Sequence, residues 1–92
     1  MKYTWDKEKE NKNIEKHGFD FTLAEEILNG SVVADIVDDR FNYGEERRLV
    51  YSVVNDKKLC MCYVYRVDVI RVISIRRVHE KEWRKYYGDS HI

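Results

Sequence analysis

The chain opens with a short alternating run and continues with a charged, helix-forming stretch. Residues 3–5 can form a short strand. Asp6 is a favoured N-cap residue, and the charged run after it contains no proline, which predicts a helix through about Lys16. Gly18 then stands where a left-handed helix C-cap is expected. The start of the chain therefore predicts one strand followed by one capped helix.

A second, shorter helix is expected soon after the first. Thr22 and Glu25 have the spacing of a capping box, in which a hydroxyl and a carboxylate satisfy the first backbone N–H groups of a helix. The apolar positions that follow place this helix over about residues 24–28. Asn29 and Gly30 then predict its end.

From Ser31 onward the helical period gives way to strand alternation. Four runs rich in β-branched and aromatic residues follow, at residues 32–37, 49–54, 59–65 and 69–76. The last three are separated only by short turn signals, at residues 55–56 and 67–68. Short connections of this kind predict an antiparallel meander.

The pattern becomes helical again from about His79, where Trp83 can pack on the sheet. The predicted fold is α+β: a short N-terminal strand, two helices, an antiparallel meander of about four strands and a C-terminal helix. A chain of 92 residues is too short to divide, so we expect one domain over residues 1–92, with residues 88–92 as a loose tail.

The composition is typical of a soluble globular domain, with 43% hydrophobic and 37% charged residues. No apolar run approaches the ~20 residues of a membrane-spanning helix. The charged opening at residues 1–6 lacks the apolar core of a signal peptide. We therefore expect a cytoplasmic protein.

The net charge is zero, but the two halves of the chain differ. Residues 1–45 contain six Lys/Arg and eleven Asp/Glu, whereas residues 46–92 contain eleven and six. The basic half is rich in arginine, whose planar guanidinium suits phosphate. Charge alone leaves two interpretations open: a surface that faces an RNA backbone, or a solvated sheet face next to a charged helix.

Cys60 and Cys62 lie two residues apart in an apolar run and should project from one face of a strand. A disulfide between them would close a very tight ring, and a metal site would need further ligands nearby. We expect buried, reduced thiols, with a metal or redox role as the alternative.

Several arginines fall on or beside the last two predicted strands: Arg66, Arg71, Arg76 and Arg77. An arginine with apolar neighbours, such as Arg71, is costly to bury unless its guanidinium pairs with a carboxylate or binds a ligand. It can pair with a carboxylate of Glu45, Glu46 or Glu82, or it can clamp a phosphate. Strand alternation places Arg71 and Arg76 on opposite faces of the sheet unless a bulge intervenes.

The histidines are too scattered for a zinc site. His17 lies at the predicted end of the first helix, where the helix dipole favours a protonated imidazole. It can cap the last carbonyls or act as an acid or base. The chain also lacks a P-loop, a dinucleotide-binding fingerprint and a nucleophile elbow, which disfavours NTPases, Rossmann enzymes and common hydrolases.

Two groups of polar and apolar residues follow one another in a recognisable order. The first group is Trp5-Asp6, Lys9, Asn13, Lys16-His17-Gly18, Phe21 and Ala24. The second group is Asp39-Arg40, Gly44-Glu45-Glu46-Arg47, Tyr63, Arg66, residues 71–77, Glu82 and Tyr86. In this order and spacing the chain resembles the BrnT toxin family over about residues 3–86. It departs from the family at three packing positions, with Ser52 where a glycine is common and Ile75 and Val78 where alanines are expected.

The resemblance implies a RelE-like fold and a toxin of a type II toxin–antitoxin system that inhibits growth by cleaving RNA. It also implies a partner, a BrnA-like ribbon-helix-helix antitoxin. The two proteins would form a hetero-oligomer that contacts operator DNA through the antitoxin. We expect a metal-independent endoribonuclease with no cofactor.

Cleavage of RNA without metal requires a base for the ribose 2′-OH, cations for the charge on phosphorus, and an acid for the leaving oxygen. We assign Arg71 and Arg76 to the phosphate. His17 ranks first as base or acid because its ordinary pKa lies near the working pH. Glu45 and Glu46 follow. The expected supporting RNA contacts are Lys16, Arg47, Tyr63, Arg66 and Arg77.

Two alternatives fit the same residues. Arginine, tyrosine and tryptophan are common in protein interfaces, so the chain can be a binding module without activity. It can also be a toxin that keeps its fold and partner but has lost catalysis.

Overall fold

The computed structural model describes residues 1–40 and 44–86 and has an α+β fold, as predicted. In chain order the elements are β1 (Lys2–Trp5), α1 (Lys7–His17), the 3₁₀ turn η1 (Phe21–Leu23), α2 (Ala24–Asn29), β2 (Ser31–Asp38), β3 (Arg47–Val54), β4 (Lys57–Arg66), β5 (Val69–Arg77) and α3 (Glu80–Tyr86). The predicted tail at 88–92 lies outside the described residues. No helix in the described part is long and apolar enough to cross a membrane.

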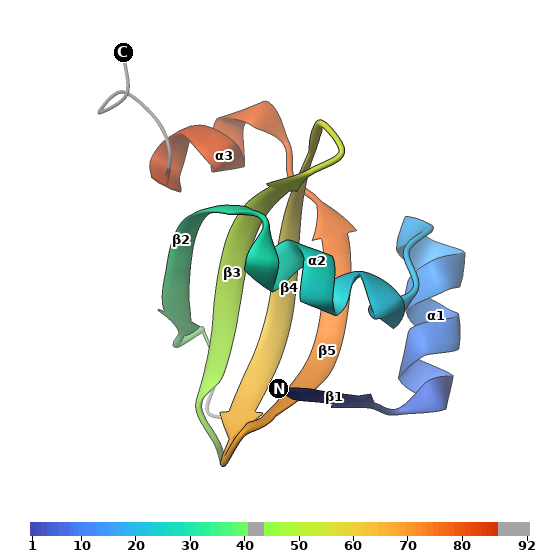
Figure 1. Cartoon of the computed structure of the whole chain (residues 1–92). Helices are drawn as coiled ribbons and strands as arrows, with labels where there is room; N and C mark the ends of the chain where they lie inside the picture. Colours follow the sequence, from blue (N-terminus) through green and yellow to red (C-terminus); the bar gives the residue numbers. More distant parts are fainter. Residues whose placement is uncertain (41–43, 87–92) are drawn as a thin grey trace.

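The strands of the described part form one sheet in the order β1-β5-β4-β3-β2. Strands β2 to β5 pair antiparallel, which confirms the predicted meander. Strand β1 pairs parallel with β5, from Lys2 opposite Val69 to Trp5 opposite Val72. In Figure 1, α2 crosses one face of the sheet, α1 stands beside the β1–β5 edge, and α3 lies at one end.

The predicted caps of α1 are confirmed. The Asp6 side chain accepts hydrogen bonds from the backbone N–H groups of Glu8 and Lys9, at 2.8 and 3.1 Å. Gly18 ends the helix with φ +82°, a left-handed conformation that glycine adopts without steric cost.

The predicted cap of the second helix was wrong. Asp20, not Thr22, caps this segment, because its carboxylate accepts the backbone N–H of Thr22 at 2.9 Å. The Thr22 hydroxyl also donates to Asp20, so it is already used. The carboxylate is the stronger acceptor, and the segment therefore begins two residues earlier, as η1, before α2 continues to Asn29.

Tight turns join the last strands as predicted. Asn55 and Asp56 have φ of 49° and 64° between β3 and β4, the pair of positive values that defines a type I′ hairpin turn. Asp68, between β4 and β5, has φ 65°. Asparagine and aspartate are among the residues that tolerate this conformation best.

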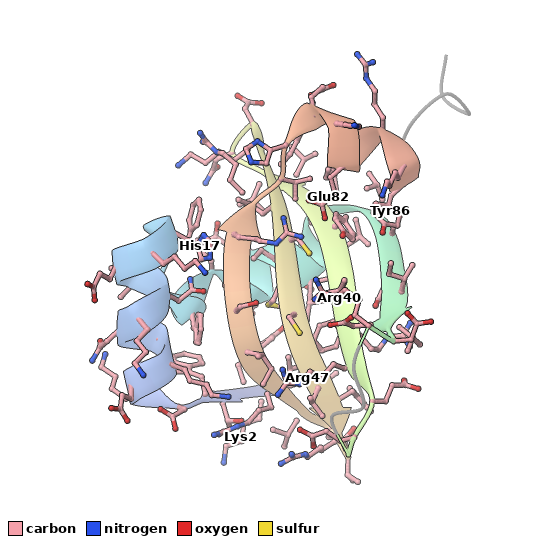
Figure 2. The ribbon with its side chains drawn as sticks, turned by 180° about the vertical axis from the view of Figure 1, so that it is seen from behind. Lys2, His17, Arg40, Arg47, Glu82 and Tyr86 are labelled. Carbon is pink, nitrogen blue, oxygen red and sulfur yellow. The ribbon has the colours of Figure 1, made fainter. Side chains whose placement is uncertain are left out.

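The two faces of the sheet carry separate hydrophobic clusters. We call the side packed against α2 the helix face; its buried residues include Phe21, Ala24, Ile27, Val50, Met61, Tyr63, Val72 and Ile75. We call the other side the open face; its buried residues are Leu49, Tyr51, Cys60, Cys62, Val78 and Trp83. On the open face, α3 covers only one end of the sheet, as Figure 2 shows.

Cys60 and Cys62 lie together on the open face as buried, free thiols, which confirms the expectation. Burial raises the pKa of Cys60 to about 11 and also raises that of Cys62. Both groups are therefore protonated near neutral pH and pack as small apolar residues.

Helix α1 is joined to the sheet by one buried amide. The Asn13 side chain donates to the carbonyl of Ile75 and accepts from its N–H, at 2.9 and 3.1 Å. It also donates to the carbonyl of Phe19 at 2.9 Å. The side chain thus pairs with β5 as a neighbouring strand would, beyond the point where β1 ends.

We predict that Asn13→Ala lowers the free energy of unfolding by about 2–4 kcal/mol, because it leaves the buried N–H and C=O of Ile75 without partners. Urea unfolding measures this. The matched control is Asn11→Ala, an exposed asparagine of the same helix, which should change stability by less than about 0.5 kcal/mol. Equal losses in the two variants would contradict the role given to Asn13.

We predict that Ser52→Ala raises the free energy of unfolding by about 1 kcal/mol. Ser52 is fully buried in β3, and its hydroxyl has no hydrogen-bond partner among the described residues. Removing the hydroxyl removes an unsatisfied polar group at almost constant volume. Thermal and urea unfolding would show the gain, and a loss of stability instead would reveal a partner for the hydroxyl.

Candidate functional site

The open face carries polar side chains from several segments of the fold. Figure 2 shows Arg40, Arg47, Glu82 and Tyr86 on this side of the sheet, with His17 beside it at the end of α1. Arg47 begins β3, while Glu82 and Tyr86 belong to α3. Residues from four separate segments therefore meet on one surface.

A bulge in β5 brings Arg71 and Arg76 to this surface together. Tyr63 of β4 pairs with Val72, but the next pair is Cys62 with Ser74, so Ile73 is an extra residue in β5. An extra residue reverses the alternation of all positions that follow it. Strict alternation predicted the two arginines on opposite faces. Because of the bulge they lie on the same face instead.

The strand pairings give the faces directly. Arg71 lies opposite Val64, and Arg76 lies opposite Cys60. Val64 and Cys60 are four residues apart on β4 and therefore project to the same side. Because Cys60 belongs to the open-face cluster, both arginines lie on the open face.

Arg76 is held by a carboxylate of α3. Its Nη1 and Nη2 donate to Oε1 and Oε2 of Glu82 at 2.9 and 2.7 Å, and the hydroxyl of Tyr51 donates to the same carboxylate at 2.7 Å. The bonded guanidinium lowers the pKa of Glu82 to about 2, and the bonded carboxylate raises the pKa of Arg76. Tyr86 stacks on Tyr51, with ring centres 4.3 Å apart. The four side chains fix α3 on the sheet.

Arg71 lacks the carboxylate partner that the sequence allowed. Among residues 1–40 and 44–86 its side chain forms no ion pair or hydrogen bond. Each carboxylate considered for it, on Glu45, Glu46 and Glu82, pairs with a different arginine. Arg71 is half-buried, so its guanidinium is available to a ligand on the open face.

His17 lies one helical turn beyond Asn13, whose amide is fixed on Ile75. It is therefore on the side of α1 that faces β5, within reach of the charge of Arg76. Burial, and then the charges of Lys16 and Arg76, lower the pKa of His17 below its ordinary 6.5. The helix dipole had predicted a protonated imidazole. That prediction was wrong, because burial and the two cations outweigh the dipole. The imidazole is therefore neutral at pH 7.

A second group of cations surrounds Cys62. Burial raises the pKa of this thiol, and the charges of Arg47, Asp38, Arg40 and Lys9 act on it as well. Arg40 pairs with Asp38 through its Nε at 2.7 Å. Arg47 was predicted as an RNA contact, whereas Lys9 and Arg40 were named only as family-motif residues and not as site residues. The four-residue spacing of Lys9, Asn13 and His17, which puts all three on one stripe of α1, would have revealed Lys9.

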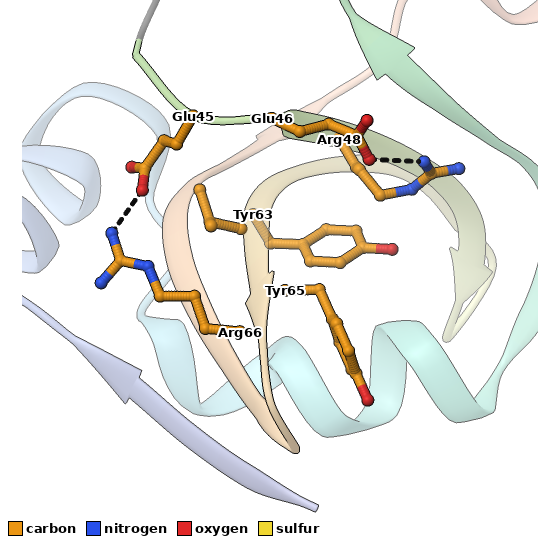
Figure 3. Close-up of a pocket in the computed structure, with 7 residues that line it drawn as sticks. Glu45, Glu46, Arg48, Tyr63, Tyr65 and Arg66 are labelled. Atoms are coloured by element: carbon orange, nitrogen blue, oxygen red, sulfur yellow. Dashed lines mark hydrogen bonds and ion pairs between the residues drawn. The ribbon is translucent and has the colours of Figure 1, made fainter.

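The acidic candidates are already paired. Glu45 binds Arg66, and Glu46 binds Arg48 at 3.2 Å (Figure 3). The hydrogen bond from Arg66 lowers the pKa of Glu45. These residues line a cavity of about 470 Å³ next to the end of β4, together with Tyr63, Val64 and Tyr65. The structure therefore groups Glu45, Glu46 and Arg66 at the end of the sheet, apart from His17 and Arg76.

Tyr63 and Arg77 lie on the helix face. Tyr63 belongs to that core and donates its hydroxyl to Asp35 at 2.6 Å, while burial raises its pKa to about 12. Arg77 pairs with Leu59, a residue of the same core. Neither side chain shares a surface with Arg71 and Arg76. Lys16 is exposed beside His17.

The described residues contain no group of three His, Cys, Asp or Glu side chains that could hold a metal ion. The side chains at this surface include guanidinium groups and a neutral imidazole. Such a set binds phosphate and accepts a proton.

A family model described as the ribonuclease toxin BrnT of type II toxin–antitoxin systems matches residues 5–82. The matched span includes Lys9, His17, Arg71, Arg76 and Glu82. No curated protein sequence matches the chain. Because the match covers well over half of the 92 residues, the chain belongs to the BrnT family of ribonuclease toxins of type II toxin–antitoxin systems.

Proposed function

We propose that the open face is the active site of a metal-independent endoribonuclease, in which His17 and Arg76 act at the cleaved bond. The observation that carries this proposal is the bulge at Ile73, which puts Arg71 and Arg76 on one surface beside His17. The family is one of ribonuclease toxins, and this surface combines a neutral imidazole with guanidinium groups.

His17 is the base in this proposal. Its lowered pKa keeps the imidazole neutral at pH 7, so it can accept the proton of a ribose 2′-OH. The oxygen then attacks the adjacent phosphorus, and the bond to the 5′-oxygen breaks. The products are a 2′,3′-cyclic phosphate and a free 5′-OH.

Arginine supplies the charge stabilisation. As phosphorus gains a fifth oxygen, negative charge builds up on the non-bridging oxygens, which guanidinium N–H groups bind strongly. Arg76 lies close enough to His17 for its charge to affect the imidazole. Lys16 is the neighbouring ammonium group, and we assign to it the proton for the leaving oxygen.

Other candidates fit structural roles better. The carboxylates of Glu45 and Glu46 are engaged by Arg66 and Arg48, and Tyr63 is bonded to Asp35 on the helix face. An ionised, paired carboxylate is a poor acid. We therefore leave these residues outside the proposed reaction, although Glu45 lies near Arg47 at the border of the open face.

The type II family implies an antitoxin partner. We propose that this partner is a BrnA-like ribbon-helix-helix protein, as the resemblance implies, and that it blocks the open face. Its DNA-binding part would carry the complex to the operator. The inhibition of growth would then follow from cleavage of cellular RNA by free toxin.

We predict that Arg71→Gln and Arg76→Gln each reduce RNA cleavage by about 10²–10³-fold, because each removes a cation that stabilises charge on phosphate. The assay measures initial rates on a short labelled RNA with EDTA present. Arg84→Gln is the matched control, since Arg84 is an exposed arginine of α3, and it should cut at the wild-type rate.

The same variants can be expressed alone in cells, with growth and total RNA followed together. Wild type and Arg84→Gln should arrest growth and fragment RNA, and the other two should not. If wild type is folded and free but leaves RNA intact, the domain is a binding module or an inactive toxin. Full activity of soluble Arg71→Gln and Arg76→Gln would refute the assignment of the site.

We predict a pH dependence set by His17. Because its pKa lies below the ordinary 6.5, the cleavage rate should rise with pH as the imidazole loses its proton, with a midpoint below pH 6.5. His17→Gln should lose this rise together with most of the rate. A variant that keeps the same rise would show that another group is the base.

A further inference from the structure

The two arginines of the open face are far apart along the sheet. Their partners on β4, Val64 and Cys60, are separated by four residues. At about 3.3 Å per residue, the backbone positions of Arg71 and Arg76 are therefore about 13 Å apart.

Helix α1 gives a second, independent measure of this separation. Arg71 acts electrostatically on Asp6, at the start of α1, whereas Arg76 acts on His17, at its end. The eleven steps from Asp6 to His17 rise about 1.5 Å each, or roughly 16 Å in all. Both measures place the arginines at opposite ends of the same surface.

Glu82 keeps Arg76 at its own end. The carboxylate belongs to α3, which follows the end of β5, while Arg71 lies near the start of that strand. Two N–H groups of Arg76 are bonded to Glu82, and the hydroxyl of Tyr51 fixes the carboxylate in turn. Turning Arg76 toward Arg71 would break this pair.

Arg76 still has donors for a ligand. A guanidinium has five N–H groups, and the pair with Glu82 uses one on each Nη. The Nε–H and one N–H on each Nη remain. Nε–H and the adjacent Nη N–H form a second fork, which suits a phosphate as well as the first fork suits a carboxylate. The side chain is 30% exposed, so a ligand can reach it.

We infer that Arg71 and Arg76 bind two different phosphates of one RNA strand, which lies along β5 between the start of α1 and α3. This inference rests on the proposed function and specifies its substrate. The cut bond lies at the Arg76 end, next to His17. The other phosphate lies at the Arg71 end of the surface.

The separation sets a minimum length for the substrate. A stacked nucleic-acid strand advances about 3.4 Å per nucleotide, so 13 Å corresponds to about four stacked steps and to fewer in an extended strand. A dinucleotide has one internal phosphate and would reach only one arginine. Two phosphates require an RNA strand of at least three nucleotides, and a span of about four stacked steps requires about six.

The test neutralises one phosphate at a time. The probe is a six-nucleotide RNA with 2′-O-methyl groups throughout, which cannot be cleaved, and each phosphate in turn is replaced by an uncharged methylphosphonate. Binding to wild type should weaken about tenfold at two separate phosphates, because each loses a charge-assisted contact. Arg71→Gln should abolish the sensitivity at one of them and Arg76→Gln at the other.

Two results would overturn the inference. One is that both variants lose sensitivity at the same phosphate, which means a single clamp. The other is a uniform loss at all phosphates, which means diffuse attraction. If wild type does not bind the unmodified probe, the proposed function itself fails, and the inference fails with it. Arg76→Lys keeps the charge if Arg76→Gln does not fold.

Glu82→Gln tests what holds the arginines apart. With the ion pair weakened, Arg76 can approach Arg71, and the sensitivity at its phosphate should fall or move to a neighbouring one. Glu80→Gln is the matched control, because Glu80 lies on the same helix and pairs with Lys58 at the surface. It should keep the wild-type pattern. An unchanged pattern in Glu82→Gln would exclude Glu82 as the spacer.

Discussion

The surface described above depends on the extra residue that Ile73 adds to β5. With it, Arg71 and Arg76 share the open face, while Val72 and Ile75 both stay in the core of the helix face. Without it, either an arginine would enter that core or an apolar residue would leave it. A one-residue change of register moves whole rows of side chains, so a single bulge decides which face of the sheet the arginines occupy.

Ion pairs join acidic residues of the first half of the chain to arginines of the second half. The acidic first half supplies Asp35 and Glu45, which bind Arg48 and Arg66 of the basic second half. Such pairs at the surface add little stability, but they neutralise arginines that would otherwise attract phosphate non-specifically. Arg71 has no such partner among the described residues. On the open face Arg71 therefore keeps a guanidinium that is not bound to a carboxylate, although the chain as a whole has zero net charge.

Two contacts hold the helices that border this surface, one made by an amide and one by a carboxylate. Asn13 fixes α1, and with it His17, against β5. Glu82 fixes α3 against Arg76 and Tyr51. Both contacts join residues of helices to the same strand, so the proposed base and Arg76 hold their positions without a ligand. Preorganised charges of this kind stabilise a transition state more than flexible ones do, because they need no rearrangement during the reaction.

The sequence by itself determined the elements, the caps of α1, the hairpin turns and the buried thiols, because these depend on neighbours in the chain. Its motifs also led to the family. It did not determine the cap of the second helical segment, the faces of Arg71 and Arg76, or the direction of the His17 pKa. The tertiary structure decided these, since a bulge appears only when two strands are in register. Likewise, the pKa of His17 depends on burial and on Arg76, a residue far away in the chain.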